Sequence, residues 1–173
     1  LNNVNMAVRP GEVHALLGEN GAGKSTLIKI ISGYHQPDEG SEMLIGGLPV
    51  TFKSPKDAID SSIHTIYQEL TLCPDMTVAE NIVLDKQKQF KGFIVNNREY
   101  HMIASRVLAD LGQSDINPNT PVRRLSIAQQ QVVEIAKAVT SDAKIVLMDE
   151  PTSSISQSDA DILMDIIRVL RDK

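Results

Sequence analysis

A glycine-rich stretch at residues 18–26 constrains this chain more than any other feature of its sequence. The stretch fits the pattern of a glycine, four free positions and then Gly-Lys-Ser. An apolar run at residues 13–17 precedes it and predicts a buried strand. A helical pattern follows, with apolar residues on one side and Gly33 at its expected end. Strand, glycine-rich turn and helix are the context in which this pattern forms a phosphate-binding loop, or P-loop.

The residue types in the loop suit a phosphate chain. Glycines let the backbone fold around phosphates without side-chain clashes, and the N–H groups of the turn and of the helix N-terminus would point at the anion. Lys24 would reach the β- and γ-phosphates, and the Ser25 hydroxyl would ligate Mg²⁺. A glycine-rich turn that binds nothing is the alternative, which the flanking strand and helix disfavour. The candidate ATP-binding residues are Gly18, Glu19, Asn20, Gly21, Ala22, Gly23, Lys24, Ser25 and Thr26.

Composition bounds the class of protein. The chain has 173 residues, enough for one domain with an apolar core. Its net charge of −5 argues against a nucleic-acid binder held by a basic face. The single cysteine, Cys73, cannot form an internal disulfide, which fits a reducing compartment. Because the sequence begins at Leu1 and in what reads as the middle of a strand, we expect a fragment that is truncated at both ends.

The order of the expected elements indicates an α/β core. Short strands at residues 42–45 and 50–52 flank a Gly-Gly pair and predict a hairpin. Ser54, followed by proline, opens a short helix. Residues 63–67 are rich in β-branched side chains and predict a strand that ends at Gln68.

The middle of the chain, residues 71–124, predicts a helical insertion between strands of this core. Thr77 begins a capping-box pattern for a short helix. Residues 85–91 are polar and charged and indicate a solvated loop. Asn97 is expected to cap a longer helix.

The last part of the chain carries two further candidate sites. Ser126 begins another capping box, and a capped helix N-terminus is an anion site, although a plain helix cap is the alternative. Residues 145–148 form an apolar run typical of a central parallel strand and lead to Asp149 and Glu150. Beside a P-loop, Asp149 would hold Mg²⁺ and Glu150 would polarise the attacking water, whereas such a pair alone is usually a solvated strand end. Ser158 is expected to cap a final helix.

Four motifs occur in the order found in the ATPase domain of ABC transporters, and the chain resembles that family over essentially its whole length. Residues 18–26 are similar to its Walker A motif, Gln68 to its Q-loop and residues 145–150 to its Walker B motif. The residues of these motifs resemble those of the ribose/monosaccharide import ATPases. The intact P-loop resembles the first, N-terminal ABC domain of the two that those proteins carry. The segment that resembles the signature motif consists of Leu125, Ser126, Ile127, Ala128 and Gln129.

The resemblance implies a P-loop NTPase fold with a RecA-like core of the ABC type. The core would comprise residues 1–70 and 125–173 with a small antiparallel β subdomain, and residues 71–124 would be the helical subdomain. The implied activity is ATP hydrolysis, with ATP and Mg²⁺ as cofactors, that powers import of a ribose-like monosaccharide through a membrane permease. The implied location is peripheral, on the cytoplasmic face of the inner membrane.

The resemblance also implies partners. These are the permease subunits, a second ABC domain in the same full-length chain or in a dimer, and indirectly a periplasmic sugar-binding protein; no nucleic acid is expected. Residues 69–84 would form the groove for the coupling helix of the permease. A non-transport ABC ATPase and an inactive truncated ABC fold remain the alternatives.

Roles follow by position. Glu150 and Gln68 would be catalytic, and Ser25, Gln68 and Asp149 would hold the metal ion. Ser126 would bind the γ-phosphate of an ATP molecule held by the opposite domain. The adenine-stacking aromatic and the switch histidine of the family have no equivalent here, so this chain by itself is expected to be inactive.

The chain departs from the family pattern in two further places. Ile127 and Ala128 stand where many relatives have glycines, but helical positions after a serine cap do not require glycine. Residues 154–157 replace the usual Ser-Ala-Leu-Asp.

Overall fold

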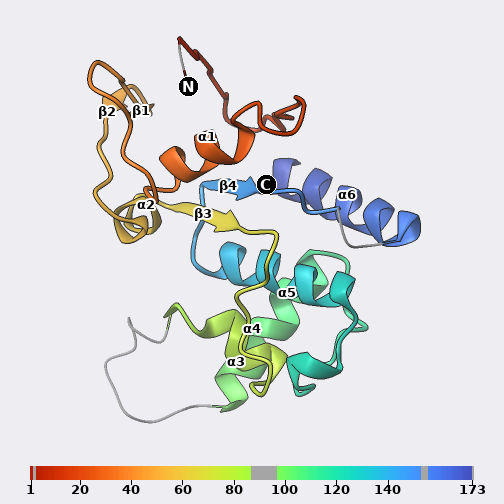
Figure 1. Ribbon diagram of the computed structural model, residues 1–173. Coiled ribbons are helices and arrows are strands. Elements are labelled where there is room, and N and C mark those ends of the chain that lie inside the picture. Colours follow the sequence, from red (N-terminus) through yellow and green to blue (C-terminus); the bar gives the residue numbers. More distant parts are fainter. Residues whose placement is uncertain (2, 87–96, 153–155, 173) are drawn as a thin grey trace.

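The computed structural model describes residues 1, 3–86, 97–152 and 156–172 (Figure 1). The expected loop at residues 85–91 and the departure at residues 154–157 therefore fall partly outside the described residues. In chain order the elements are α1 (Lys24–Ile31), β1 (Leu44–Ile45), β2 (Leu48–Pro49), α2 (Pro55–Asp60), β3 (Ile63–Ile66), α3 (Val78–Val83), α4 (Asn97–Asp110), the 3-10 turn η2 (Val122–Arg124), α5 (Ile127–Thr140), β4 (Ile145–Met148) and α6 (Gln157–Asp172).

Strands β3 and β4 form a parallel pair although most of the helical residues lie between them in the sequence. Ile63 pairs with Ile145 and Ile66 with Met148, and the N–H of Asp149 donates to the carbonyl of Ile66 at 3.0 Å. Figure 1 shows α1 on one side of this sheet and α5 on the other. Because parallel strands end at the same edge of a sheet, the residues that follow β3 and β4 are brought together there.

The strand predicted at residues 13–17 is wrong. These residues adopt no regular structure, and Val13 and Leu17 are 52% and 89% exposed. An apolar run indicates a preference for burial, but a strand also needs a hydrogen-bonded neighbour. Within the described ranges β3 and β4 pair only with each other, so β4 is not the central strand that the sequence predicted.

The main apolar core joins the helices to the sheet. Helices α3, α4, α5 and α6 all contribute side chains, and α3, α4 and α6 pack against α5 (Figure 1). The deepest side chains, each at most 1% exposed, include Val78, Ile82, Leu108, Val133, Ile135 and Ile166. A smaller cluster of Phe52, Ala58 and Ile63 lies beneath the hairpin. Burial of this kind supplies most of the stability of such helices.

Local signals define the ends of several elements. Thr77 and Ser126 accept hydrogen bonds from the N–H groups three residues later, each at 3.2 Å, so both predicted capping boxes are confirmed. The hairpin is confirmed around its Gly-Gly pair, whose φ values of 59° and 79° suit a tight primed turn, but its second strand is β2 at Leu48–Pro49 and not the predicted residues 50–52.

The predicted cap of the last helix is wrong by two residues. The N–H of Asp159 donates to the Oγ of Ser156 at 3.3 Å, so Ser156 rather than Ser158 caps α6. Serine stands at both positions, and the sequence alone did not separate them.

In the part of the chain that the structure describes, no helix combines the length and the apolarity needed to cross a bilayer.

Candidate nucleotide-binding site

The P-loop leads directly into α1, whose first residue is Lys24. Gly23 caps this helix at φ 95° and ψ 10°, and Gly21 also has a positive φ of 84°. Both are left-handed conformations that glycine adopts without steric cost. The Nζ of Lys24 donates to the carbonyls of Gly18 and Glu19 at 2.8 and 3.0 Å. The loop therefore brings together a helix N-terminus and the ammonium group of Lys24, which lies against the backbone of the loop. Both features attract anions.

The P-loop helix is joined to the end of β4. The Oγ of Ser25 donates to Oδ1 of Asp149 at 3.4 Å, across 124 positions of sequence, and both residues are partly buried. Hydroxyl and carboxylate oxygens are the ligands that Mg²⁺ prefers, and Mg²⁺ commonly uses one or two protein ligands together with phosphate oxygens and waters. The pair therefore fits a magnesium ion bound beside a phosphate chain.

Glu150 follows Asp149 in an uncommon backbone conformation. Its φ is 48°, in the left-handed region, and a residue that precedes proline is normally extended. The Nε2 of Gln131 on α5 donates to the carbonyl of Pro151 at 2.8 Å. The backbone on either side of Glu150 is thus held by β3 through Asp149 and by α5 through Pro151.

Gln68 lies at the same edge of the sheet. It follows β3 by two residues, as Glu150 follows β4, and the register pairs the last residues of the two strands. Both side chains are exposed. The sheet therefore brings Gln68, Asp149 and Glu150 to one edge, next to Ser25.

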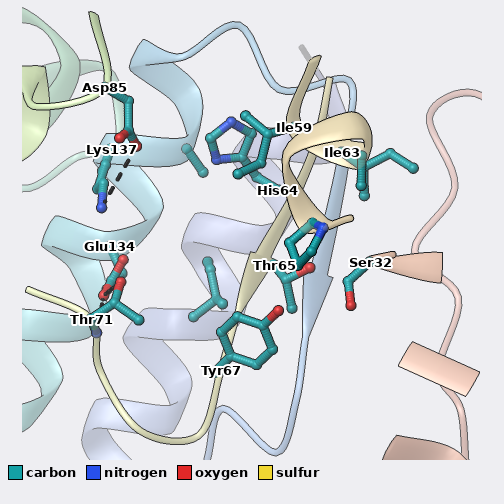
Figure 2. Close-up of a pocket in the computed structure, with 14 residues that line it drawn as sticks. Ser32, Ile59, Ile63, His64, Thr65, Tyr67, Thr71, Asp85, Glu134 and Lys137 are labelled. Carbon is teal, nitrogen blue, oxygen red and sulfur yellow. Dashed lines mark hydrogen bonds and ion pairs between the residues drawn. The ribbon is translucent and has the colours of Figure 1, made fainter. Parts of the chain in front are cut away.

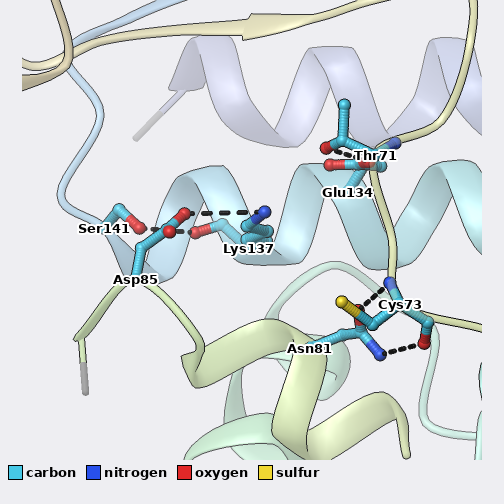
Figure 3. A network of polar contacts seen from close by, with 7 residues as sticks. All are labelled: Thr71, Cys73, Asn81, Asp85, Glu134, Lys137 and Ser141. Atoms are coloured by element: carbon cyan, nitrogen blue, oxygen red, sulfur yellow. Dashed lines mark hydrogen bonds and ion pairs between the residues drawn. The ribbon is translucent and has the colours of Figure 1, made fainter. Parts of the chain in front are cut away.

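Two buried polar side chains hold the segment that follows Gln68 (Figure 3). Glu134 of α5, 7% exposed, accepts hydrogen bonds from the N–H and the Oγ1 of Thr71 at 2.6 and 2.8 Å. Asn81 of α3, 1% exposed, accepts from the N–H of Cys73 at 2.8 Å and donates to its carbonyl at 3.1 Å. The segment is therefore tied to both α5 and α3.

The sequence reasoning missed both of these side chains. The available signal was a polar residue inside an apolar helix face, since Glu134 follows Val133 and Asn81 precedes Ile82. A buried polar group needs a partner, so such a residue predicts a long-range hydrogen bond without naming its partner.

A pocket of about 220 Å³ lies beside this segment, between β3, α2 and α5 (Figure 2). His64 of β3, Asp85, Glu134 and Lys137 line it, and the Nζ of Lys137 lies 3.6 Å from Oδ2 of Asp85. His64 is 9% exposed, and its Nε2 has no hydrogen-bond partner among the described residues. Burial lowers the pKa of His64, and the carboxylate of Asp85 is the largest opposing influence. The predicted site residues do not line this pocket.

The signature segment lies at the N-terminus of α5. Ser126 and Gln129 form a reciprocal capping box, in which Oε1 of Gln129 accepts from the N–H of Ser126 at 3.1 Å. Ile127 and Ala128 are helical and lack positive φ, so the absence of glycine there is accommodated as predicted. A pocket of about 280 Å³ beside Ser126 is lined by residues of α5, α6 and the segment after α4, and none comes from residues 18–26.

Comparison with known proteins identifies the family of the chain. The ABC transporter family model matches residues 1–153. A ribose import ATP-binding protein of Streptomyces coelicolor is 46% identical over 173 residues, which cover all of this chain and 34% of that protein. A putative ribose/galactose/methyl galactoside import ATP-binding protein of Agrobacterium fabrum is 49% identical over 171 residues, which cover 99% of this chain and 33% of that protein. The chain thus spans about a third of the length of the curated relatives it matches.

Solved structures show the same fold. The ADP conformation of an ATP-binding cassette of an ABC transporter matches with a TM-score of 0.81 and 26% identity, over 98% of this chain and 69% of that one. A dimeric cassette in a post-hydrolysis state, bound to ADP and phosphate, matches with a TM-score of 0.77 and 28% identity, over 98% of this chain and 74% of that one. The resemblance predicted from the motifs is confirmed: the chain belongs to the ABC transporter family and has the P-loop NTPase fold of its ATP-binding cassettes.

Proposed function

We propose that this chain is the ATP-binding and ATP-hydrolysing part of a protein that powers import of a ribose-like monosaccharide through a membrane permease. The observation that carries the proposal is the contact between Ser25 and Asp149, which places the P-loop helix beside the acidic end of β4. The sugar class is supported by relatives that are named ribose, arabinose and ribose/galactose import ATP-binding proteins.

In this proposal residues 18–26 bind the phosphate chain of ATP. The N–H groups of the loop and of the first turn of α1 donate to the phosphate oxygens. Lys24 exchanges its carbonyl partners in the loop for the β- and γ-phosphates. Ser25, Asp149 and Gln68 hold Mg²⁺, which when bound neutralises negative charge on the phosphates.

Glu150 serves as the general base. Its carboxylate accepts a proton from the attacking water as the new bond to the γ-phosphorus forms, and ADP departs on the opposite side. Gln68 orients the same water from the end of β3. Ser126 and the N-terminus of α5 bind the γ-phosphate of an ATP molecule held by a second ABC domain, which lies in the full-length chain or in a dimer partner.

The partners follow from the same assignment. Residues 71–124 form the helical subdomain of the cassette, and residues 69–84 form the groove for the coupling helix of the permease. The hydrogen bonds from Thr71 to Glu134 and from Cys73 to Asn81 support a groove of fixed shape. The protein is then peripheral, on the cytoplasmic face of the inner membrane, and receives its sugar indirectly from a periplasmic binding protein.

A nucleotide titration with a transport assay tests the proposal. In the full-length protein, Lys24→Ala should abolish tight ATP binding, because the loop loses its ammonium group, whereas Lys29→Ala on the same helix should not. Near-normal affinity of Lys24→Ala would refute the P-loop assignment.

Vesicles that contain the permease should take up labelled ribose, arabinose or galactose only with ATP inside. ATP hydrolysis without uptake of any of these sugars would favour a non-transport ATPase.

A further inference from the structure

Gln131 links the helix of the signature segment to the backbone beside Glu150. Its side chain is partly buried on α5, and its Nε2 donates to the carbonyl of Pro151 at 2.8 Å. Its Oε1 is buried and has no hydrogen-bond partner among the residues that the structure describes. The bond to Pro151 is therefore the described hydrogen bond that orients this amide.

The backbone that receives this bond is strained. Glu150 has a φ of 48° and precedes a proline, and a non-glycine residue keeps such a conformation only where its surroundings enforce it. The sheet fixes one side, since the N–H of Asp149 donates to Ile66 at 3.0 Å. Proline has no N–H, and on this side the carbonyl of Pro151 accepts the hydrogen bond from Gln131.

We propose that Gln131 is a positioning residue for ATP hydrolysis and that its hydrogen bond to Pro151 sets the direction of the Glu150 carboxylate. The inference rests on the proposed function, in which Glu150 is the general base. Gln131 lies five positions after Ser126, about 7.5 Å along the helix axis. One rigid helix therefore joins the base of one ATP site to the serine that would serve the opposite site.

Loss of this bond should affect rate rather than ATP binding. No described hydrogen bond joins Gln131 to the P-loop or its lysine, so we expect ATP binding at the loop to change little, although Gln131 also lines the pocket beside Ser126. Misplacement of a catalytic group by about 1 Å lowers rates by about 100-fold. In the full-length protein we expect Gln131→Met to lower kcat by about 10- to 100-fold, with the Kd for ATP within about twofold of wild type.

Three variants make the test specific. Gln131→Glu at pH 8 keeps the shape but replaces the donor with an acceptor, so it should lose the same rate and covers the case in which Gln131→Met does not fold. Thr140→Val, on the same helix, removes a buried hydroxyl that has no hydrogen-bond partner among the described residues, and it should keep the wild-type kcat. The double variant Gln131→Met/Glu150→Gln should hydrolyse ATP within about twofold of the rate of Glu150→Gln alone, because no base remains to be positioned.

The outcomes separate this inference from the proposed function. Wild-type kcat in Gln131→Met and Gln131→Glu, beside an inactive Glu150→Gln, would overturn the inference alone. An equal fold loss with and without Glu150, or an equal loss in Thr140→Val, would also overturn it, because the rate would then follow the packing of α5. Wild-type turnover by Glu150→Gln would instead refute the proposed base, and the inference with it.

Discussion

Replacement of Asn81 by leucine should destabilise the fold more than any surface change, and the structure gives the size of the effect. The side chain is 1% exposed and satisfies both backbone groups of Cys73, at 2.8 Å to the N–H and 3.1 Å to the carbonyl. Its bonds to the carbonyls of Cys73 and Thr77 are less critical, because the N–H of Met76 also donates to the first and the N–H of Asn81 itself to the second. Leucine has a similar volume, so the loss is mainly one of hydrogen bonding.

The N–H of Cys73 would lose its partner, whereas its carbonyl keeps the hydrogen bond from the N–H of Met76 at 3.2 Å. A backbone group left unsatisfied costs about 1–3 kcal/mol, so we expect a decrease of about 1–3 kcal/mol in the free energy of unfolding. Domains of this size have about 5–15 kcal/mol in total, so a large fraction of the stability would be lost. Urea unfolding followed by circular dichroism should show a lower midpoint with an unchanged slope.

The reasoning is refuted if Asn81→Leu changes the free energy of unfolding by less than about 0.5 kcal/mol, the range of ordinary surface substitutions. Asn119→Ala is the matched control, because this asparagine is exposed and only its backbone N–H takes part in a described hydrogen bond. Amide hydrogen exchange adds a local measurement. The N–H of Cys73 should exchange faster in Asn81→Leu, while that of Thr71, which Glu134 holds, should change less.

Three further predictions follow from the site and its surroundings. Glu150→Gln in the full-length protein should keep ATP affinity but lose about 100-fold or more of turnover, measured as phosphate release, and wild-type hydrolysis would place the base elsewhere. Burial lowers the pKa of His64, so below about pH 6.5 the unfolded chain binds a proton that the folded chain excludes. The free energy of unfolding should therefore decrease as pH falls through that range, and an equal decrease in His64→Leu would contradict this assignment. Gly33→Ala should lower the melting temperature by several degrees, because Gly33 has a φ of 72° and a Cβ there would lie 2.5 Å from the carbonyl oxygen of Ser54; an unchanged melting temperature would contradict the strain argument.

Local chemistry made much of the fold predictable. The caps at Thr77 and Ser126, the hairpin around two glycines and the short helix after Ser54 depend on residues within a few positions of one another. Strands β3 and β4 were also predicted, from a β-branched and an apolar run of strand length, but their pairing with each other was not. These elements carry their own signals, so one sequence is enough to identify them.

Elements that depend on distant partners were not predictable in the same way. The run at residues 13–17 has the composition of a strand, but no neighbouring edge pairs with it in the described structure. The partners of Glu134 and Asn81 lie in a loop with no marked sequence pattern. A pattern of apolar residues says which side of an element is buried, but not which backbone groups a buried polar side chain will meet.

Helix α5 explains why the candidate site depends on such contacts. Its N-terminus carries Ser126, Gln131 binds the carbonyl next to Glu150, and Glu134 binds the segment that follows Gln68. Gln131 and Glu134 are three positions apart, and residues at that spacing share one face of a helix. Helix α5 therefore binds both loops that carry the proposed catalytic residues, in addition to the pairing of β3 with β4 that brings the two loops together.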